Sequence, residues 1–428
     1  MDNFIEFLYS RFLLSDGVSI DTRTVRTGDL FFGIKGPNFN GSAYAEEALS
    51  KGANYAVIDD PAHETDDKRL IYCENAQQAL QELAVFHRSK FFRPVIGLTG
   101  SNGKTTTKEL VAAILAKKYI IHATKGNLNN HLGVPLTILG IYPQVEIAII
   151  EMGANHIGDI AELCQFANPT IGLITNIGHA HTELFGGIEG VLRGKTELFD
   201  HLRDKQGLPF INLEDNRLKH LTARFEEPVT FPGADVKLLD EGPLVSVQIG
   251  TLTASTQLFG SYNFGNIAAA IALGRYFEVA DHLIVEALEQ YVPDNMRSQV
   301  IEDNNVTLIM DAYNANPDSM LVALENLTKQ DGKKLAIVGD MYEIENQEDA
   351  HKHIGDWLNK NHMEAVFVGE RMKSAMTAYP AATYCQTLEE AKEYLKSVDL
   401  TGYHVLLKAS RSVKLEQLKE SILQLSST

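Results

Sequence analysis

The sequence has little cysteine and no long run of apolar residues. Only three cysteines occur among 428 residues, and they stand far apart without the spacing of metal ligands. This excludes a small disulfide-stapled protein and is typical of reduced thiols in the cytosol. No apolar run reaches the ~18 residues of a membrane span, and the first residues lack the basic region and cleavage site of an export signal. We therefore expect a cytoplasmic protein without a membrane span.

Basic residues are also scarce. The 38 lysines and arginines are outnumbered by 56 aspartates and glutamates, which gives a formal net charge of −18. A field of this sign repels phosphate backbones, so we expect no nucleic-acid partner, and any bound phosphate needs a local site. With 44% hydrophobic and 22% charged residues, the composition is that of a folded globular protein rather than a disordered one.

The length predicts about three domains, at roughly 150 residues each. We place the boundaries near residues 90 and 293, which gives domains 1–90, 91–292 and 293–428. In each domain, short apolar runs alternate with helical patterns, and this alternation predicts an α/β fold with mostly parallel sheets. Residues 228–262 are richer in β-type segments, and we expect them to form an antiparallel flank to the central sheet.

The strongest local signal is LTGSNGKTTTKEL at residues 98–110. It follows an apolar strand pattern and opens an amphipathic helix. Glycines allow backbone N–H groups to surround phosphate oxygens, Lys104 would reach the β- and γ-phosphates, and the Thr105 hydroxyl would bind Mg²⁺. The full Walker spacing is absent, because Leu98 stands five residues before Gly103. The plainer alternative is a glycine-rich turn that binds nothing.

The loop TGSNGKTTT resembles that of the Mur ligase family and its folylpolyglutamate synthase relatives. Further blocks match in order, including GNLNNHLGVPLTIL, AIIEMGANHIGDI, TNIGHAHTELFGG, SYNFGN, DAYNANPDSM, IVGDMYEI and LLKASRS. Together they resemble the branch that joins D-alanyl-D-alanine to UDP-N-acetylmuramoyl-tripeptide in peptidoglycan synthesis. The resemblance implies a small N-terminal α/β UDP-binding domain, a central P-loop-type ATP-binding domain and a C-terminal Rossmann-like domain. It also implies amide formation through an acyl phosphate, with ATP and Mg²⁺.

Metal ligands are predicted in two ways. Glu151 ends an apolar strand, where its carboxylate can face the phosphate loop, although a solvated strand-end glutamate is the alternative. His181 and Lys195 are ligands only by the resemblance, which implies that Lys195 carries a carbamate. Without the resemblance, Lys195 would be interpreted as a solvated lysine on a helix. His179 lies two positions before His181, and either histidine could be the metal ligand.

Nucleotide and substrate contacts follow from the loop and from the resemblance. The residues expected to bind ATP are Gly100, Ser101, Asn102, Gly103, Lys104, Thr105, Thr106, Asn266, Arg297 and Asp311. Of these, Lys104 and Arg297 are also expected to act in catalysis, together with His181 and Lys195. The residues expected to bind the other substrates are Thr22, Arg23, Asn129, Asn130, Tyr313, Asn314 and Asn316. Local alternatives are a helix cap for Asn266, turns for Asp311, Asn129 and Asn130, and a surface arginine for Arg23.

Two other functions remain open at this stage. Another Mur-type or a folylpolyglutamate-type ligase would share the phosphate loop. A nucleotide-gated binding or regulatory protein would hydrolyse ATP slowly without forming a ligated product. Whichever function applies, we expect the protein to be a monomer.

Overall fold

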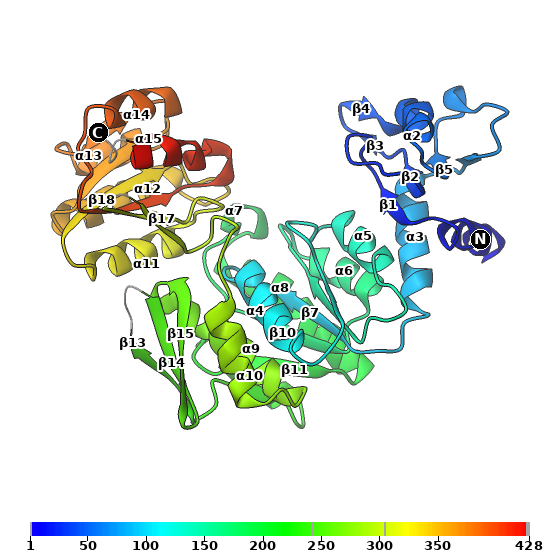
Figure 1. Cartoon of the computed structure of the whole chain (residues 1–428), viewed down its shortest axis with the longest axis horizontal. Coiled ribbons are helices and arrows are strands. Elements are labelled where there is room, and N and C mark those ends of the chain that lie inside the picture. Colours follow the sequence, from blue (N-terminus) through cyan, green and yellow to red (C-terminus); the bar gives the residue numbers. More distant parts are fainter. Residues whose placement is uncertain (1, 241–243, 304, 425–428) are drawn as a thin grey trace.

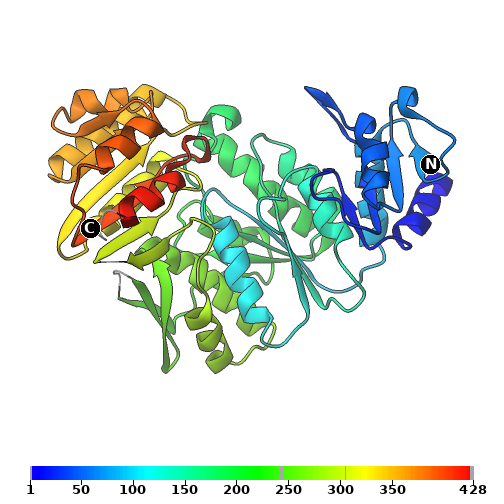
Figure 2. The ribbon, with the colours of Figure 1, turned by 45° about the horizontal axis from the view of Figure 1, so that its top comes forward.

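The computed structural model describes residues 2–240, 244–303 and 305–424. Three α/β units follow one another along the longest axis of the molecule (Figure 1), with the N-terminal unit in blue at one end and the C-terminal unit in yellow to red at the other. After rotation the same order remains, with the middle unit between the other two (Figure 2). Within the described ranges, no helix is both long and apolar enough to cross a bilayer.

The N-terminal unit is built on a four-stranded parallel sheet in the order β1-β2-β5-β6. Its strands are β1 (Gly17–Ser19), β2 (Asp29–Phe32), β5 (Tyr55–Ile58) and β6 (Leu70–Tyr72), and a short hairpin joins β3 (Lys35–Gly36) to β4 (Phe39–Asn40). Its helices are α1 (Asp2–Phe12), α2 (Ala45–Ser50) and α3 (Ala76–Arg88). Asn75 caps α3 by accepting from the amide of Gln78, which fixes where this connecting helix begins.

The middle unit has a six-stranded sheet in the order β12-β11-β10-β7-β9-β8, and every pair in it is parallel. The strands are β7 (Val95–Thr99), β8 (Ile121–Ala123), β9 (Ile147–Glu151), β10 (Ile171–Ile174), β11 (Leu208–Asn212) and β12 (Val229–Phe231). Strands β7, β9 and β10 are buried throughout, as expected for a parallel sheet covered on both faces.

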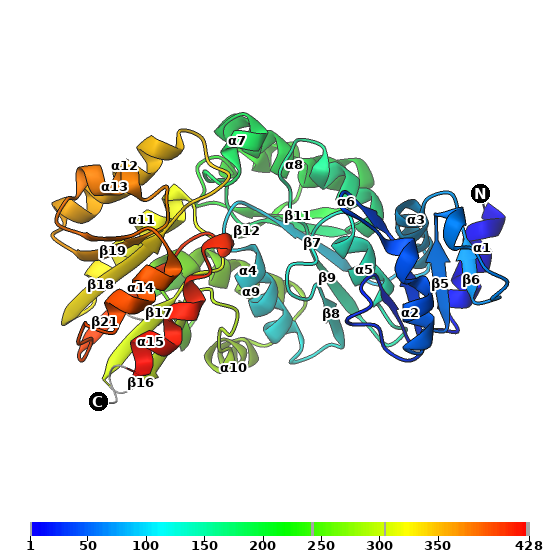
Figure 3. The same ribbon diagram turned by 90° about the horizontal axis from the view of Figure 1, so that it is seen from above.

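Helices cover both faces of this sheet (Figure 3). One face packs on α4 (Lys104–Leu115), α9 (Phe264–Tyr276) and α10 (Asp281–Gln290), and the other on α5 (Gly133–Leu139), α6 (Asp159–Ala167) and α8 (Ile188–Lys205). The helix that follows β7 therefore lies on the opposite face from those that follow β9 and β10. In open α/β sheets, ligands bind where this change of side occurs.

The segment expected to form an antiparallel flank is only partly antiparallel. Strand β12 joins the parallel sheet, whereas β13 (Val236–Asp240), β14 (Leu244–Ile249) and β15 (Leu252–Phe259) form a separate antiparallel sheet of three strands. The prediction of an antiparallel segment is confirmed for β13, β14 and β15 and wrong for β12, which runs parallel to β11 and packs on α9 through the buried Phe231. The antiparallel sheet packs on α10, and Val245, Val247 and Ala254 belong to the same hydrophobic core as that helix.

The C-terminal unit has a six-stranded sheet in the order β16-β17-β21-β18-β19-β20. Strand β16 (Gln299–Asp303) is antiparallel to β17 (Val306–Met310), and the remaining strands are parallel: β18 (Lys333–Gly339), β19 (Glu364–Val368), β20 (Thr383–Cys385) and β21 (Tyr403–Lys408). Helices α11 (Pro317–Thr328), α12 (Gln347–Lys360) and α13 (Lys373–Ala378) cover one face, and α14 (Leu388–Leu395) and α15 (Lys419–Gln424) cover the other. The expected Rossmann-like arrangement is confirmed, with two edge strands, β16 and β20, that the sequence pattern did not reveal.

Helix α7 (Thr182–Phe185) lies at the border between the middle and C-terminal units (Figures 1 and 3). It packs against the start of α8 through two glycines. A Cβ at Gly190 would collide with the carbonyl oxygen of Phe185, and a Cβ at Gly194 would collide with the ring of the same residue. These close contacts set the position of α8, which carries Lys195.

We predict that Gly190→Ala lowers the free energy of unfolding by about 1–3 kcal/mol, because overpacking forces α7 away from α8. Urea unfolding followed by circular dichroism measures this. The matched control is Gly265→Ala in α9, where the nearest atom to a new Cβ is 3.8 Å away. Since alanine favours a helix over glycine by about 1 kcal/mol, the control variant should be as stable as the parent or more so. Equal stability of both variants would contradict this packing.

Candidate active site

A cavity of about 840 Å³ lies between the middle and C-terminal units, and residues from both line it. At its centre is the loop between β7 and α4. Gly100 (φ 147°) and Gly103 (φ 78°) adopt backbone conformations that favour glycine. A Cβ at Gly100 would collide with Thr175, and one at Gly103 with the Asn266 side chain. No side chain caps α4, so its first amides are available to an anion.

Lys104 folds back over this loop. Its Nζ donates to the carbonyl oxygens of Gly100 (2.7 Å) and Ser101 (3.2 Å). Burial lowers the pKa of the ammonium to about 8, the Glu151 carboxylate opposes this shift, and the Arg297 guanidinium adds to it. A phosphate group beside Lys104 would favour its charged form, so the lysine is set to respond to an anionic ligand.

Glu151 is 1% exposed at the end of β9. Its Oε1 accepts hydrogen bonds from the Asn129 side chain (2.8 Å) and from the Thr105 hydroxyl (3.3 Å), while Oε2 is buried without a partner. The Thr124 hydroxyl accepts from the Glu151 amide at 2.9 Å and fixes the strand end. A buried carboxylate oxygen without a donor, next to a hydroxyl, is the hard oxygen set that Mg²⁺ prefers.

Of the two histidines, the structure places His181 at the cavity and His179 beside it. His181 lines the cavity, whereas His179 contacts Asp318 of α11. Burial lowers the pKa of His181 to about 4, with further lowering by Lys104 and Lys195, so the ring is neutral at pH 7. Its Nδ1 lies 2.7 Å from Glu343 Oε2 without hydrogen-bond geometry. Neutral imidazole is the form that can bind a metal.

Lys195 is 1% exposed, in contrast to the solvated lysine that its helix pattern favours. Its Nζ donates to the carbonyl oxygen of Ala154 (3.1 Å) and lies 5.2 Å from the centre of the Phe185 ring. Burial holds the pKa of this amine well below its usual range, and Lys104 lowers it further. The local interpretation as a surface lysine was therefore wrong, because α8 turns this side chain inward onto Ala154 and Phe185. Lys195 is not among the lining residues of the cavity, although Ala154, its hydrogen-bond partner, is.

No group of three or more His, Cys, Asp or Glu side chains within the described residues could hold a metal by itself. The expected set relies instead on a threonine hydroxyl, a carboxylate, a histidine and a modified lysine. The unpartnered Oε2 of Glu151 and the Thr105 hydroxyl fit Mg²⁺ without any such cluster.

The C-terminal unit contributes charge from the opposite side. The Arg297 guanidinium lies 3.8 Å from the centre of the Tyr313 ring, and its Nε is buried without a hydrogen-bond partner. Asp311 Oδ2 accepts from Lys408 Nζ at 2.5 Å, and this lysine is 2% exposed. Lys408 stands in the LLKASRS block but was not predicted as a site residue. A buried lysine facing a carboxylate 97 positions away gives no local signal.

Asn266 and the residues before it line the adjoining wall. The Asn266 Oδ1 accepts from the Thr107 hydroxyl (3.1 Å) and its Nδ2 donates to Asn263 (2.9 Å). Tyr262 and Ser298, which were not predicted, meet here through their hydroxyls at 2.7 Å. Asn266 itself lines the cavity. It lies inside α9 and does not cap this helix, so the alternative role as a helix cap was wrong.

Most of the remaining predicted residues also line this cavity. Asn130 accepts from the amides of Leu132 and Gly133, as in a turn, and lines the cavity together with Asn129. Ser101, Asn102, Thr106, Tyr313 and Asn314 also line it, whereas Asn316 is not among the lining residues. Both polar atoms of the Asn316 side chain bond within the protein.

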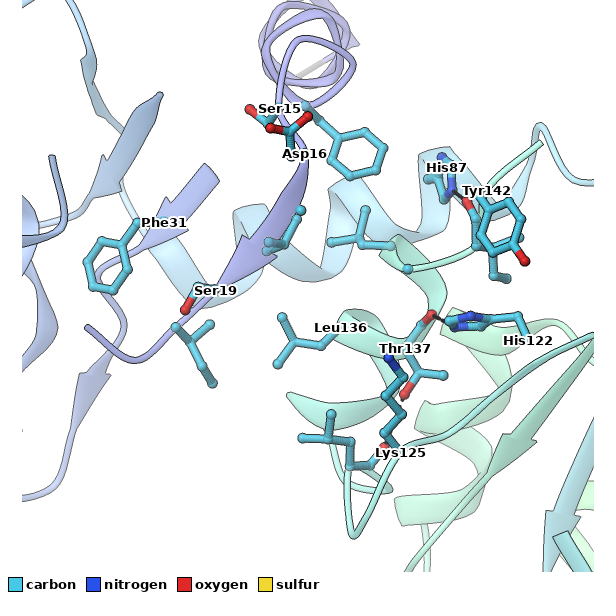
Figure 4. Close-up of a pocket in the computed structure, with 18 of the residues that line it drawn as sticks. Ser15, Asp16, Ser19, Phe31, His87, His122, Lys125, Leu136, Thr137 and Tyr142 are labelled. Atoms are coloured by element: carbon cyan, nitrogen blue, oxygen red, sulfur yellow. Dashed lines mark hydrogen bonds between the residues drawn. The ribbon is translucent and has the colours of Figure 1, made fainter. Parts of the chain in front are cut away.

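Thr22 and Arg23 lie elsewhere, at a second cavity of about 1700 Å³ between the N-terminal and middle units. Arg23 is exposed and pairs with Asp21 at 2.6 Å. Deeper in this cavity, the His122 ring contacts the Thr137 carbonyl oxygen at 2.7 Å near Lys125 (Figure 4). Residues 125 and 128 line this cavity while residues 127, 129 and 130 line the other, so one loop lies between the two spaces.

The fold and the site define a three-domain nucleotide-binding protein, and family comparisons give its class. Residues 15–88 match the family model described as "Mur ligase family, catalytic domain", residues 98–274 match "Mur ligase middle domain", and residues 296–411 match "Mur ligase, glutamate ligase domain". The chain belongs to the Mur ligase family.

Individual relatives narrow the match. The chain is 32% identical over 426 residues to the UDP-N-acetylmuramoyl-tripeptide–D-alanyl-D-alanine ligase of Bacillus subtilis, covering 95% of this chain and 93% of the relative. It is 30% identical to the Escherichia coli enzyme of the same name, over the same shares. MurF from Acinetobacter baumannii has a similar structure (TM-score 0.84, 29% identity, 95% and 93% covered). So does MurF from Thermotoga maritima in complex with ADP (TM-score 0.84, 28% identity, 97% and 99% covered).

We predict that Lys104→Ala reduces turnover by about 100-fold or more, because the variant loses the cation closest to the loop where phosphate charge would develop. Nucleotide affinity should fall less, since the backbone amides of the loop remain. Steady-state ADP release and calorimetric titration of ATP measure the two effects. Near-normal turnover would contradict a role of Lys104 at the phosphates.

Proposed function

We propose that this protein is an ATP-dependent amide ligase that joins D-alanyl-D-alanine to UDP-N-acetylmuramoyl-tripeptide in peptidoglycan precursor synthesis. The observation that carries the proposal is the loop at 125–130, which lines both cavities. A substrate whose uridine end occupies the cavity beside Thr22 and Arg23 can extend past this loop. Its peptide carboxylate would then reach the phosphate loop. The relatives of that name match over nearly the whole chain.

In this reaction, the terminal carboxylate of the tripeptide attacks the γ-phosphate, and ADP leaves. The amine of D-alanyl-D-alanine then attacks the acyl phosphate carbonyl, loses a proton, and expels inorganic phosphate as the amide bond forms. Two anions must approach in the first step, so Lys104 and Arg297 would lower the barrier by offsetting their charge. The protein supplies no covalent nucleophile in this scheme.

Thr105, Glu151, His181 and Lys195 would hold Mg²⁺, which when bound neutralises phosphate charge. The buried amine of Lys195 supports a carbamate, because a lowered pKa favours the neutral amine that reacts with carbon dioxide. Asn266 would contact the adenine and Asp311 the ribose, while Tyr313, Asn314 and Asn316 would serve the peptide substrates. We further propose domain limits at residues 1–90, 91–292 and 293–428, a monomer, and a cytoplasmic location without nucleic-acid partners.

One assay tests the function against its alternatives. Product and ADP are measured with ATP, UDP-N-acetylmuramoyl-tripeptide and D-alanyl-D-alanine, and each is omitted in turn. The proposal predicts ligated product only when all three are present. Product from a folate and glutamate would instead identify a folylpolyglutamate-type ligase, and slow ATP hydrolysis without any acceptor-dependent product would identify a nucleotide-gated protein.

The second test concerns the Lys195 carbamate. We predict that Lys195→Ala abolishes ligation, because the variant lacks the anion that would orient the metal. Formate or acetate should restore part of the rate by occupying the vacated space, whereas chloride at equal ionic strength should not. Circular dichroism controls for folding, since this side chain is buried. Full activity of the variant without added carboxylate would reject the carbamate role.

A further inference from the structure

The first turn of α11 reaches from the C-terminal unit to the phosphate loop. Asn316 caps this helix through its Oδ1, which accepts from the Ser319 amide at 2.9 Å, and the Ser319 hydroxyl completes a capping box. Its Nδ2 donates across the domain boundary to Asn102 Oδ1 at 2.8 Å. Because the cap fixes the orientation of the Asn316 amide, the contact with Asn102 is part of a rigid helix start.

The backbone of Asn102 is fixed by hydrogen bonds within the middle unit. Its backbone amide donates to Asn176 Oδ1 (3.0 Å), and its carbonyl oxygen accepts from the Thr175 hydroxyl (2.6 Å) and from Asn176 Nδ2 (3.0 Å). The middle unit therefore holds the loop backbone, while the C-terminal unit holds the side chain through Asn316. A shift of α11 would act directly on the phosphate loop.

A second contact lies two positions further along the chain, at Asp318. Asp318 Oδ2 accepts from the His179 backbone amide at 2.8 Å, and the His179 Nδ1 lies 3.0 Å from Oδ1 and 2.9 Å from Oδ2. A Cβ at Gly178 would lie 2.9 Å from Asp318 Oδ2, so the absence of a side chain there permits the approach. The acid also lies in the first turn of a helix, where the macrodipole favours a negative charge.

We propose that Asn316 and Asp318 are positioning residues that latch the C-terminal domain onto the phosphate loop, through Asn102 and His179 respectively. We call these four residues the α11 latch. Asn316 and Asp318 act by raising the fraction of molecules in which Arg297 and the phosphate loop face the same cavity. Their partner Asn102 is itself one of the residues expected to bind ATP, so the latch acts on the nucleotide through the loop. Apparent affinity scales with the fraction of binding-competent protein, so loss of the latch weakens nucleotide binding. Its contribution to ligation rests on the function proposed above.

The experiment measures binding of AMP-PNP with Mg²⁺ to the full chain by titration calorimetry. Asp318→Ala should weaken binding about tenfold, the size expected for losing one charge-assisted hydrogen bond. Asp318→Asn should restore binding to within about twofold, because an amide can accept from the His179 N–H and donate to its ring nitrogen. The His179→Ala, Asp318→Ala double variant should be no weaker than Asp318→Ala alone, since both remove one contact. Additive losses would overturn the latch.

Two further variants separate the latch from general damage. Asp349→Ala removes an exposed acid from the first turn of α12, away from the phosphate loop, and should leave AMP-PNP binding unchanged. Gly178→Ala should weaken binding like Asp318→Ala by pushing the carboxylate away. In the Asp318→Ala background, it should add nothing, because the obstructing oxygen is gone. A loss that is equally large in that background would overturn the proposal.

An assay of ligation distinguishes a failure of the latch from a failure of the proposed ligase function. If the parent protein binds AMP-PNP but forms no ligated product, the proposed function fails while the variant series still decides on the latch. If product forms, Asp318→Ala should raise the KM for ATP about tenfold with a smaller change in kcat. An unchanged KM with a reduced kcat would overturn the latch, because it would place the effect in chemistry rather than in the population of the closed state.

Discussion

Burial of basic groups beside the phosphate loop is the constraint on which the rest of the site depends. Burial lowers the pKa values of Lys104, Lys195 and His181. Lys104 adds to the lowering at Lys195 and His181, and Arg297 adds to it at Lys104, because positive charges at these positions would repel one another. Inside a protein such repulsion is only partly screened. A ligand carrying several negative charges would remove this repulsion, so the arrangement of basic groups favours a nucleotide phosphate chain over a neutral ligand.

Sheet topology explains why these groups can meet at all. The carboxyl ends of β7 and β9 in the middle domain, and of β17 and β21 in the C-terminal domain, supply Ser101, Glu151, Asp311 and Lys408 to one cavity. Parallel strands place the residues that follow them at the same edge of a sheet. Two such edges facing each other enclose a cavity with backbone amides on one side and charged side chains on the other.

The same geometry assigns different tasks to the two cavities. The larger one has apolar walls and an exposed arginine at its rim, which suits a long substrate held mainly by its shape and its end groups. The smaller one concentrates charge and buried hydrogen bonds, which suits phosphate chemistry. A ligase must keep its activated carboxyl group away from water, and a site closed by a second domain provides this.

Local features could be predicted from the sequence. Strand β7, the glycines at 100 and 103 and the start of α4 form a contiguous stretch whose pattern and chemistry predict a phosphate loop, and the α/β alternation followed from hydrophobic periodicity. The strand-end position selected Glu151, whereas the resemblance of ordered motifs selected His181 and Lys195, which local patterns alone leave ambiguous. Only the tertiary structure decided that Lys195 is buried, that β13–β15 form a separate sheet, and that Asp318 meets His179. Each of these three features depends on contacts between residues that are distant in the sequence. His179 and Asp318, for example, are 139 positions apart. Local periodicity carries no information about such contacts.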